Sequence, residues 1–268
     1  MSFVIVGGGS TGVELAGAIG ELSRIVFVKD FRNIDPKLAR IILIEAGPRI
    51  LPAFSDSLAS RAARDLESLG VQVWTGSKVS NVDKDGVDIG AERIQAGTVL
   101  WAAGIKASEL NKQLGSDLDS LGRIKVEQDL SLAKYPNIFA GGDQVCFEDK
   151  AHGILPANAP VALQQGKCIA QNIINELRDK KRKSFEYFDK GQLATIGRKK
   201  AVLEIGKMKL RGFCAWLAWL FVHIYYLIGF KNKLLVILQW GYSYLSYRKG
   251  ARLIVNKDWR FYKNTRNK

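Results

Sequence analysis

The chain has 268 residues, of which 47% are hydrophobic and 25% charged, so it can bury a sizeable core in one or two domains and has the composition of a folded protein. Its net charge of +14 is local, because the residues from Arg178 onward hold 22 Lys and Arg against 5 Asp and Glu, a net of +17, and the remainder hold 18 against 21, a net of −3. Three cysteines and two histidines show neither metal-ligand spacing nor a disulfide framework, so we expect no metal site and a reducing compartment.

The chain opens on the pattern of a dinucleotide-binding turn. The apolar residues 3–6 lead into Gly7-Gly8-Gly9-Ser10-Thr11-Gly12, and a helical pattern follows. In such a turn Gly7 permits the tight bend, Gly9 lets a pyrophosphate approach the backbone, and Gly12 lets the helix pack closely on the strand. The phosphates then lie at a helix N-terminus, where unpaired N–H groups and the helix dipole favour negative charge.

The next elements continue the alternation of strand and helix. We expect a helix from Val13 to about Phe31, a break at Asp35-Pro36, and a buried parallel strand that ends in Glu45. An acid at this strand end can bind ribose hydroxyls and repel a 2′-phosphate, which favours NAD over NADP. The alternative is a carboxylate that only faces water. The spacing from Gly12 exceeds the usual ~20 residues, but the strand context favours the ribose role.

The following segments complete an α/β domain. In chain order they are a helix over 56–69, a strand over 71–74, two short strands over 78–83 and 86–94 joined at Asp85-Gly86, and an apolar strand over 98–104. This order of elements predicts a dinucleotide-binding domain over residues 1–118.

A second segment covers residues 119–177. It contains a short buried strand that ends in Gly141-Gly142-Asp143, and a helix from Val161 to Leu177. Two glycines before a strand-end acid let a polar ligand come close, although an Asp that caps a helix N-terminus fits the same pattern.

Residues 178–268 form a basic, aromatic region. After a short hairpin over 193–205, the 19 residues 212–230 carry no formal charge, and four of the six tryptophans lie beyond residue 215. Trp and Tyr flanked by Lys and Arg are typical of a membrane interface, and a buried hairpin or an oligomer interface is the alternative. The uncharged centre argues against a nucleic-acid site.

This uncharged stretch could either span a membrane or bind to its surface. Its 19 residues are just enough for one transmembrane helix over 212–230, since the hydrocarbon core is ~30 Å thick. The closely spaced aromatics, His223 and a second patterned helix over 234–247 favour a monotopic hairpin that lies on the membrane surface.

Several of these motifs together resemble the type II NADH dehydrogenases. They are residues 7–16, 101–107, 138–143, 159–166, the segment Asp-Lys-Gly-Gln-Leu-Ala-Thr-Ile-Gly at 189–197, and the aromatic tail. The resemblance implies a single-subunit, non-proton-pumping flavoenzyme of the respiratory chain, on the cytoplasmic side of the cell membrane. Such an enzyme passes a hydride from NADH to FAD and two electrons to a membrane quinone.

The resemblance also implies a fold, that of the flavoproteins that bind two dinucleotides in interlocked Rossmann-like domains. This α/β chain would hold the NADH domain over residues 1–118, the C-terminal part of the FAD domain over 119–177, and a helical membrane-binding region over 178–268. The resemblance also allows a homodimer.

The resemblance assigns cofactor-binding roles to residues in both segments. Gly7, Gly9 and Gly12 would hold the NADH pyrophosphate and Glu45 its ribose, while Asp143 would bind the ribityl chain of the flavin. The other cofactor-binding positions that we expect are Ala103, Gly104 and Gly142.

Three residues are catalytic candidates on the same resemblance. Glu14 would tune electrostatics or proton delivery beside the flavin, and Gln164 and Gln165 begin the helix that runs under the flavin towards the quinone. The residues alone leave alternatives open. Glu14 also fits an acid in the first turn of a helix, where the dipole favours it by about 0.3–1 kcal/mol, and both glutamines fit an ordinary helix surface.

The chain departs from the family pattern in two places. It has Ala159-Pro160 where many members have Ala-Gln, and Leu163 where many have His, so a quinone-contacting glutamine is absent there. The first Gly-x-Gly-x-x-Gly of the family, which binds the adenosine diphosphate of FAD, has no counterpart in this sequence. We therefore expect this chain by itself to bind FAD poorly.

Two other interpretations stay open. One is a related flavin reductase, such as a sulfide:quinone or ferredoxin reductase; sulfide oxidation requires well-placed cysteines, and Cys146, Cys168 and Cys214 show no partnering pattern. The other is a truncated, non-catalytic protein that binds NAD(H) and a membrane.

Overall fold

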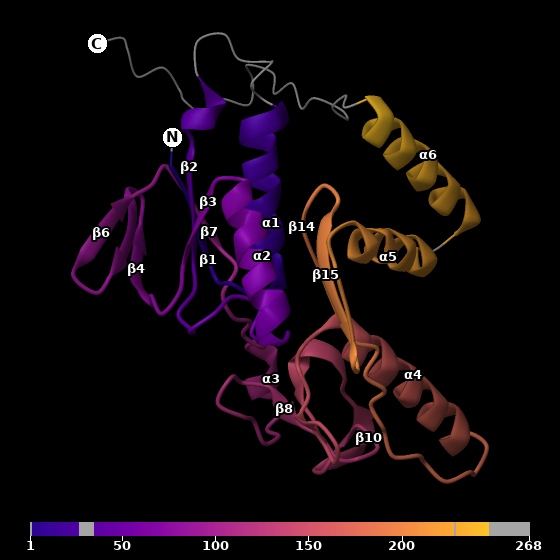
Figure 1. Ribbon diagram of the computed structural model, residues 1–268. Coiled ribbons are helices and arrows are strands. Elements are labelled where there is room, and N and C mark those ends of the chain that lie inside the picture. Colours follow the sequence, from indigo (N-terminus) through magenta and orange to yellow (C-terminus); the bar gives the residue numbers. More distant parts are fainter. Residues whose placement is uncertain (1, 27–34, 228, 247–268) are drawn as a thin grey trace, which may run out of the picture. The chain divides into compact units, whose positions relative to one another are not determined.

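The computed structural model describes residues 2–26, 35–227 and 229–246 (Figure 1). Its chain divides into two compact units. The first consists of Met1–Trp101, Leu193–Leu203 and Lys209–Lys268, and the second of Ala102–Gln192 and Glu204–Met208. These units group residues that contact each other in space. The domain boundaries predicted at residues 118 and 177 separate segments by their expected function, and they stay a prediction.

The first unit is built on a parallel sheet of four strands in the order β3-β2-β1-β7. The strands are β1 (Ser2–Val6), β2 (Arg40–Ile44), β3 (Val71–Trp74) and β7 (Thr98–Trp101). Val4 of β1 pairs with Ile42 on one side and Val99 on the other. After their first residues the central strands are apolar, and Val4–Val6 and Ile41–Ile44 are buried, as a parallel sheet covered on both faces requires. The expected α/β dinucleotide-binding architecture is therefore confirmed.

Two helices connect the first three strands of this sheet. They are α1 (Ser10–Glu21) and α2 (Asp56–Ser68), and both lie along the same face of the sheet (Figure 1). The first helix is shorter than predicted, because a π-helical turn, Leu22–Val26, follows Glu21. The rest of that predicted helix, up to Phe31, lies outside the described residues.

A small antiparallel meander follows β3. Its strands are β4 (Val79–Asp83), β5 (Gly86–Ile89) and β6 (Glu92–Gln95). The hairpin predicted at Asp85-Gly86 is confirmed, with Asp83 paired to Gly86. The single strand predicted over 86–94 is in fact two strands, since the chain turns back at Gly90, whose φ of +58° suits glycine.

Most of a three-stranded sheet, residues 193–203 and 209–211, and two helices complete the first unit. The sheet contains β14 (Gln192–Gly197), β15 (Lys200–Ile205) and β16 (Met208–Arg211), and the helices are α5 (Gly212–Tyr226) and α6 (Phe230–Ser246). Strand β14 runs close against α1, because a Cβ on Gly17 would lie 1.7 Å from the carbonyl oxygen of Ile196. The predicted hairpin over 193–205 is confirmed, with β16 as a third strand.

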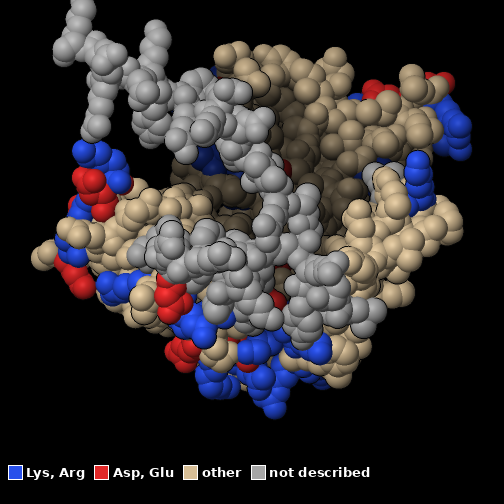
Figure 2. All heavy atoms as spheres, turned by 90° about the horizontal axis from the view of Figure 1, so that it is seen from above, with Lys and Arg blue, Asp and Glu red and all other residues tan. Residues whose placement is uncertain are grey.

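The uncharged stretch 212–230 is not one helix. Helix α5 ends at Tyr226 and α6 begins at Phe230, so the alternative of a single transmembrane helix over 212–230 is wrong. Within residues 2–26, 35–227 and 229–246, no helix has the length and apolar content needed to cross a bilayer. Both helices expose large apolar side chains, among them Phe221 at 72% and Phe230 at 82%. In the space-filling view of Figure 2, broad tan areas carry no charged side chains.

The second unit combines small sheets with one long helix. The sheets pair β8 (Ile124–Lys125) with β11 (Val145–Cys146), β9 (Ser131–Leu132) with β10 (Tyr135–Phe139), and β12 (Glu148–Asp149) with β13 (Gly153–Ile154). The helices are α3 (Leu110–Gln113) and α4 (Ala159–Glu176). Their common core contains Leu130, Phe147, Leu155, Val161 and Phe185.

Strand β10 corrects one expectation. It was predicted as a buried strand, but Tyr135–Ile138 are exposed and only Phe139 is half-buried. The physical reason is that β10 pairs with β9 alone, so that no further strand covers it within this unit.

Candidate functional site

The glycine turn lies between β1 and α1, as the sequence predicts. Gly7 has a φ of +109°, and its N–H donates to the carbonyl oxygen of Ile44 at 2.8 Å. This bond keeps the turn attached to β2 while the chain reverses direction. Gly9 then precedes the helix, and its carbonyl accepts the first helical bond from Val13 at 3.0 Å. No side chain caps this helix N-terminus, so its first N–H groups face outward, which is the arrangement that binds phosphates.

The space around each glycine tests whether the turn fits a dinucleotide. A Cβ on Gly12 would lie 1.8 Å from the carbonyl oxygen of Gly7, so only glycine permits this helix to pack so closely on the strand. A Cβ on Gly9 would meet nothing within 4 Å. Gly9 therefore borders open space beside the helix N-terminus, and a pyrophosphate could approach the backbone there.

Glu45 is joined to the glycine turn. It follows β2, and its Oε2 accepts the Gly8 N–H at 2.6 Å while its Oε1 accepts the Gly47 N–H at 2.7 Å. Glu45 was predicted correctly at the strand end, but Gly8 had no predicted role. The signal was present in Gly8 itself, the second of three consecutive glycines, since a Cβ on Gly8 would lie 2.9 Å from the Cβ of Glu45.

Glu14 occupies a different place from the one expected. Helix α1 begins at Ser10, so Glu14 lies in its second turn, and the expectation of a first-turn acid favoured by the helix dipole is wrong. Its Oε1 accepts the N–H of Thr195 at 3.1 Å and the hydroxyl of Thr195 at 3.2 Å. Residues 181 positions apart are thus joined, and Glu14 connects the nucleotide helix to β14.

The Gly-Gly-Asp turn lies in the second unit. Gly142 has a φ of +76° and begins a short 3-10 helix, Gly142–Gln144, that contains the exposed Asp143. A Cβ on Gly142 would be 3.5 Å from the Cβ of Ala162 in α4. Ala103 and Gly104, the other predicted cofactor positions of this unit, follow β7 in an irregular segment where Gly104 has a φ of +69°.

The side chains of both candidate glutamines of α4 form hydrogen bonds with backbone groups. Gln165 is 1% exposed, and its Oε1 accepts the N–H of Gly142 at 2.7 Å. Gln164 donates through Nε2 to the Phe188 carbonyl at 3.0 Å and accepts the Phe188 N–H at 3.0 Å. Gln165 thus fixes the Gly-Gly-Asp turn, and Gln164 fixes the segment that leads from α4 to β14.

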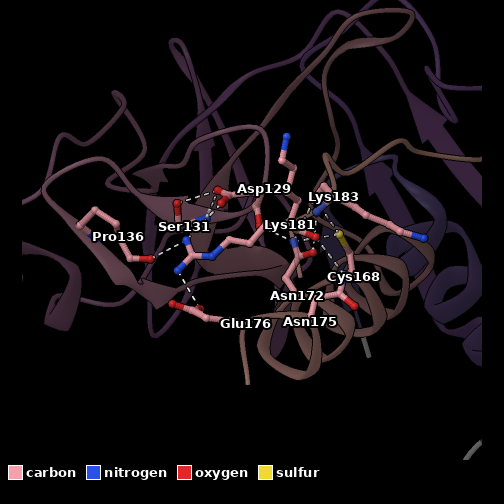
Figure 3. A network of polar contacts seen from close by, with 10 residues as sticks. Asp129, Ser131, Pro136, Cys168, Asn172, Asn175, Glu176, Lys181 and Lys183 are labelled. Carbon is pink, nitrogen blue, oxygen red and sulfur yellow. Dashed lines mark hydrogen bonds and ion pairs between the residues drawn. The ribbon is translucent and has the colours of Figure 1, made fainter. Parts of the chain in front are cut away.

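A network of polar contacts anchors the same segment further along α4 (Figure 3). Asn172 is fully buried; its Nδ2 donates to the Lys183 carbonyl at 2.9 Å and to the Asp129 carbonyl at 3.1 Å, and its Oδ1 accepts the Lys183 N–H at 2.8 Å. Arg182 donates to Pro136 at 2.7 Å and pairs with Asp129 at 3.2 Å and Glu176 at 2.8 Å. Sequence analysis missed this network, because Arg182 stands in a basic run that resembles a solvated surface.

The charge of Asp129 depends on this network. Burial opposes ionisation, but hydrogen bonds from Ser131 and the ion pair with Arg182 outweigh it and hold the pKa of Asp129 below its ordinary value. The ionised carboxylate therefore contributes to the stability of the fold.

Family models match nearly the whole chain. The model described as pyridine nucleotide-disulphide oxidoreductase matches residues 1–166, and the model described as the NDH2 C-terminal domain matches residues 190–249. The first match covers the glycine turn and the Gly-Gly-Asp turn, and the second covers β14 to α6.

Curated relatives agree with these models. Type II NADH:quinone oxidoreductase Ndh of Mycobacterium tuberculosis is 40% identical in an alignment of 270 residues that covers 96% of this chain and 57% of that protein. NdhA of the same organism is 36% identical over 96% of this chain and 57% of its own length. The chain thus spans a little over half the length of these relatives.

A solved structure shows the same fold. NDH2 from Plasmodium falciparum, in a complex with NADH, has a TM-score of 0.83 at 18% identity over 94% of this chain and 67% of that one.

Proposed function

Because this chain belongs to the type II NADH:quinone oxidoreductases, within the pyridine nucleotide-disulphide oxidoreductases, we propose that it takes part in FAD-dependent transfer of reducing equivalents from NADH to a membrane quinone. The observation that carries this proposal is the glycine turn joined to Glu45. It offers an open backbone at Gly9 and a carboxylate bonded to Gly8.

In this proposal the first unit binds and orients NADH. The N–H groups at the start of α1 would receive the pyrophosphate, and the Glu45 carboxylate would accept hydrogen bonds from the adenosine ribose. Both oxygens of Glu45 already accept backbone N–H groups, which fixes the carboxylate in one orientation. A fixed negative charge there would repel the 2′-phosphate of NADPH, so NADH is the expected donor.

The second unit would contribute to the flavin site. Bound FAD supplies the hydride acceptor and passes two electrons onward. The exposed carboxylate of Asp143 would hold a polar part of the flavin, and Gly142 would let it approach the backbone, since glycine alone adopts the φ of +76° without strain. Ala103 and Gly104 would lie along the same cofactor. Gln165 would act on the flavin indirectly, by holding the Gly142 N–H at 2.7 Å.

The remaining residues would serve the acceptor side. Glu14 would supply a negative charge beside the reacting groups, and Gln164 would hold the segment that leads to β14. The exposed apolar side chains of α5 and α6, with the basic excess of residues 178–268, would rest on a membrane surface. An enzyme bound there meets a lipid-soluble quinone directly, as a peripheral membrane protein on the cytoplasmic side.

Nucleotide binding and flavin chemistry test this proposal separately. The purified chain is titrated with NADH and NADPH, and NADH should bind at least tenfold more tightly, a difference of about 1.4 kcal/mol. With FAD supplied in excess, NADH should bleach the flavin absorbance, and a short-chain quinone should restore it. Equal affinity for the two nucleotides would contradict the role of Glu45. Bleached flavin that the quinone leaves reduced would contradict a quinone as the acceptor.

A further inference from the structure

A groove of about 330 Å³ lies within the first unit. Helix α1, strand β14 with the turn after it, and helices α5 and α6 all contribute to its lining. The side chains that give it its character are Glu14, Glu21, Arg198, Trp216, Trp219 and Trp240. We call it the Trp–Glu groove.

One wall of the Trp–Glu groove is acidic. Glu14 is held by Thr195, at 3.1 Å and 3.2 Å. Glu21 accepts the Arg198 N–H at 2.9 Å, and its other oxygen lies 3.6 Å from the Arg198 guanidinium. Two carboxylates and one guanidinium leave the lining with a net charge of −1. The wall therefore attracts cations.

The opposite wall is aromatic. Trp219 of α5 stacks on Trp240 of α6, with ring centroids 5.7 Å apart and an interplanar angle of 11°. Trp216, one turn earlier on α5, is 7% exposed and packs with Ala201, Leu203 and Ala215. Each indole of this stack turns one face to the other, and Trp219 also contacts the His223 ring, with centroids 4.1 Å apart, so a cation would meet the remaining face of Trp240. Tryptophan is the aromatic side chain that binds cations best.

Helix α5 presents two different sides. Trp216, Trp219 and His223 follow each other at spacings of three and four residues and form one stripe, which includes two of the three groove tryptophans. Phe213, Leu217 and Phe221, spaced by four, form a second stripe and are 51%, 44% and 72% exposed. At 3.6 residues per turn the two stripes diverge around the helix. A groove for a polar group thus lies on the same short helix as an apolar surface.

We propose that the Trp–Glu groove binds the ammonium headgroup of a membrane amphiphile, whose hydrocarbon chain lies along the exposed apolar stripe of α5. A quaternary or protonated amine combines attraction to the acidic wall with cation–π contact to the aromatic wall. A neutral quinone ring gains nothing from the net negative charge, and an anionic headgroup is repelled by it. The inference goes beyond hydride transfer and does not depend on it.

The test observes the six tryptophans individually. The whole chain, labelled with ¹⁵N at its indole nitrogens and held in dodecyl maltoside micelles, is titrated with dodecyltrimethylammonium at constant total detergent. We expect the indole signals of Trp216, Trp219 and Trp240 to shift and saturate, while those of Trp74 and Trp101 stay in place. Dodecyl sulfate should not reproduce these shifts, and tetramethylammonium, a headgroup without a chain, should need a far higher concentration.

Substitutions in each wall of the groove, with a charge-matched control elsewhere, test which wall binds the ammonium headgroup. Glu14→Gln keeps an acceptor for Thr195 but removes a groove charge, and should weaken binding about fivefold, which corresponds to ~1 kcal/mol. Glu92→Gln removes the same charge from an exposed site on β6 and should bind as the parent does. Trp219→Leu should weaken binding similarly, and Trp219→Phe less. Circular dichroism confirms that each variant is folded.

Three results would overturn the proposal. They are equal weakening by Glu92→Gln and Glu14→Gln, equal response to dodecyl sulfate, and a uniform shift of all indole signals. Binding of tetramethylammonium as tight as that of dodecyltrimethylammonium would overturn the membrane source of the headgroup.

Discussion

Two alanine substitutions in the glycine turn should have different effects, one on the stability of the fold and the other on nucleotide binding. Gly9 and Gly12 belong to the same motif, but their surroundings differ. A Cβ on Gly9 meets nothing within 4 Å, whereas a Cβ on Gly12 would lie 1.8 Å from the Gly7 carbonyl oxygen. We therefore expect Gly12→Ala to damage the fold, and Gly9→Ala to spare the fold and damage nucleotide binding.

The magnitudes follow from these distances. The contact at Gly12 is far inside van der Waals range and involves backbone, so α1 must move away from β1, at a cost of about 3 kcal/mol of unfolding free energy. Gly9 has a φ of −69°, which alanine adopts readily. Gly9→Ala should therefore change stability by between zero and an increase of about 1 kcal/mol, because the unfolded chain loses freedom. Its methyl group would stand where the pyrophosphate approaches, and we expect a loss of NADH affinity of about 10- to 100-fold, or ~1.4–2.7 kcal/mol.

The assay combines urea unfolding, followed by far-UV circular dichroism, with NADH titration followed by nicotinamide fluorescence. The two variants serve as controls for each other, since they add the same methyl group three residues apart. The reasoning is refuted if Gly9→Ala binds NADH as the parent does, or if Gly12→Ala unfolds at the parent's urea concentration.

Three further predictions concern polar contacts. Asn172→Ala, which removes a fully buried side chain and its three bonds to the backbone of Lys183 and Asp129, should lower the unfolding free energy by about 2–4 kcal/mol in urea titrations, and a loss under 1 kcal/mol would show that the network is dispensable. Because the pKa of Asp129 is depressed in the folded state, its contribution is complete above the unfolded value of about 3.9 and is lost as the pH falls through the folded value. Urea titrations between pH 5 and pH 2.5 should thus show a shallower fall for Asp129→Asn than for the parent, and equal slopes would contradict the role of the Arg182 pair. Glu45→Gln, which turns an amide donor towards one backbone N–H, should lower stability by about 1–2 kcal/mol and bring the dissociation constants of NADH and NADPH closer together; an unchanged ratio would argue against the ribose role.

Local chemistry explains why the nucleotide-binding half could be predicted so closely. Strand β2 holds an unbroken run of four apolar, buried residues after the exposed Arg40, and such runs occur where a parallel sheet is covered on both faces. The glycine turn needs positive φ at Gly7 and close approach at Gly12, and both requirements appear in the sequence as glycine itself. Glu45 is predictable because a strand end is defined by where its apolar run stops.

The second unit was harder to predict, because its side chains act on distant backbone. Gln165 reaches the Gly142 N–H 23 residues away, and Asn172 joins Asp129 and Lys183. Neither spacing has a local signature. The same holds for Glu14, whose partner Thr195 lies 181 positions along the chain. In the tail, the sequence predicted a second helix over 234–247, but α5 already ends at Tyr226 and α6 begins at Phe230, so the break lies earlier than the end of the uncharged stretch indicated.

The elements that could be predicted are those with a local cause: the parallel strands, the glycine turn, the acid at the end of β2, and an apolar, aromatic tail. Which polar side chains form hydrogen bonds with distant backbone groups became known only from the tertiary structure. It assigned Gln164 and Gln165 to backbone groups of Phe188 and Gly142, and it brought two acids of α1 opposite the tryptophans of α5 and α6. The physical reason is that a hydrogen bond or a ring contact depends on distance in space, and residues far apart in the sequence become neighbours only when the chain has folded.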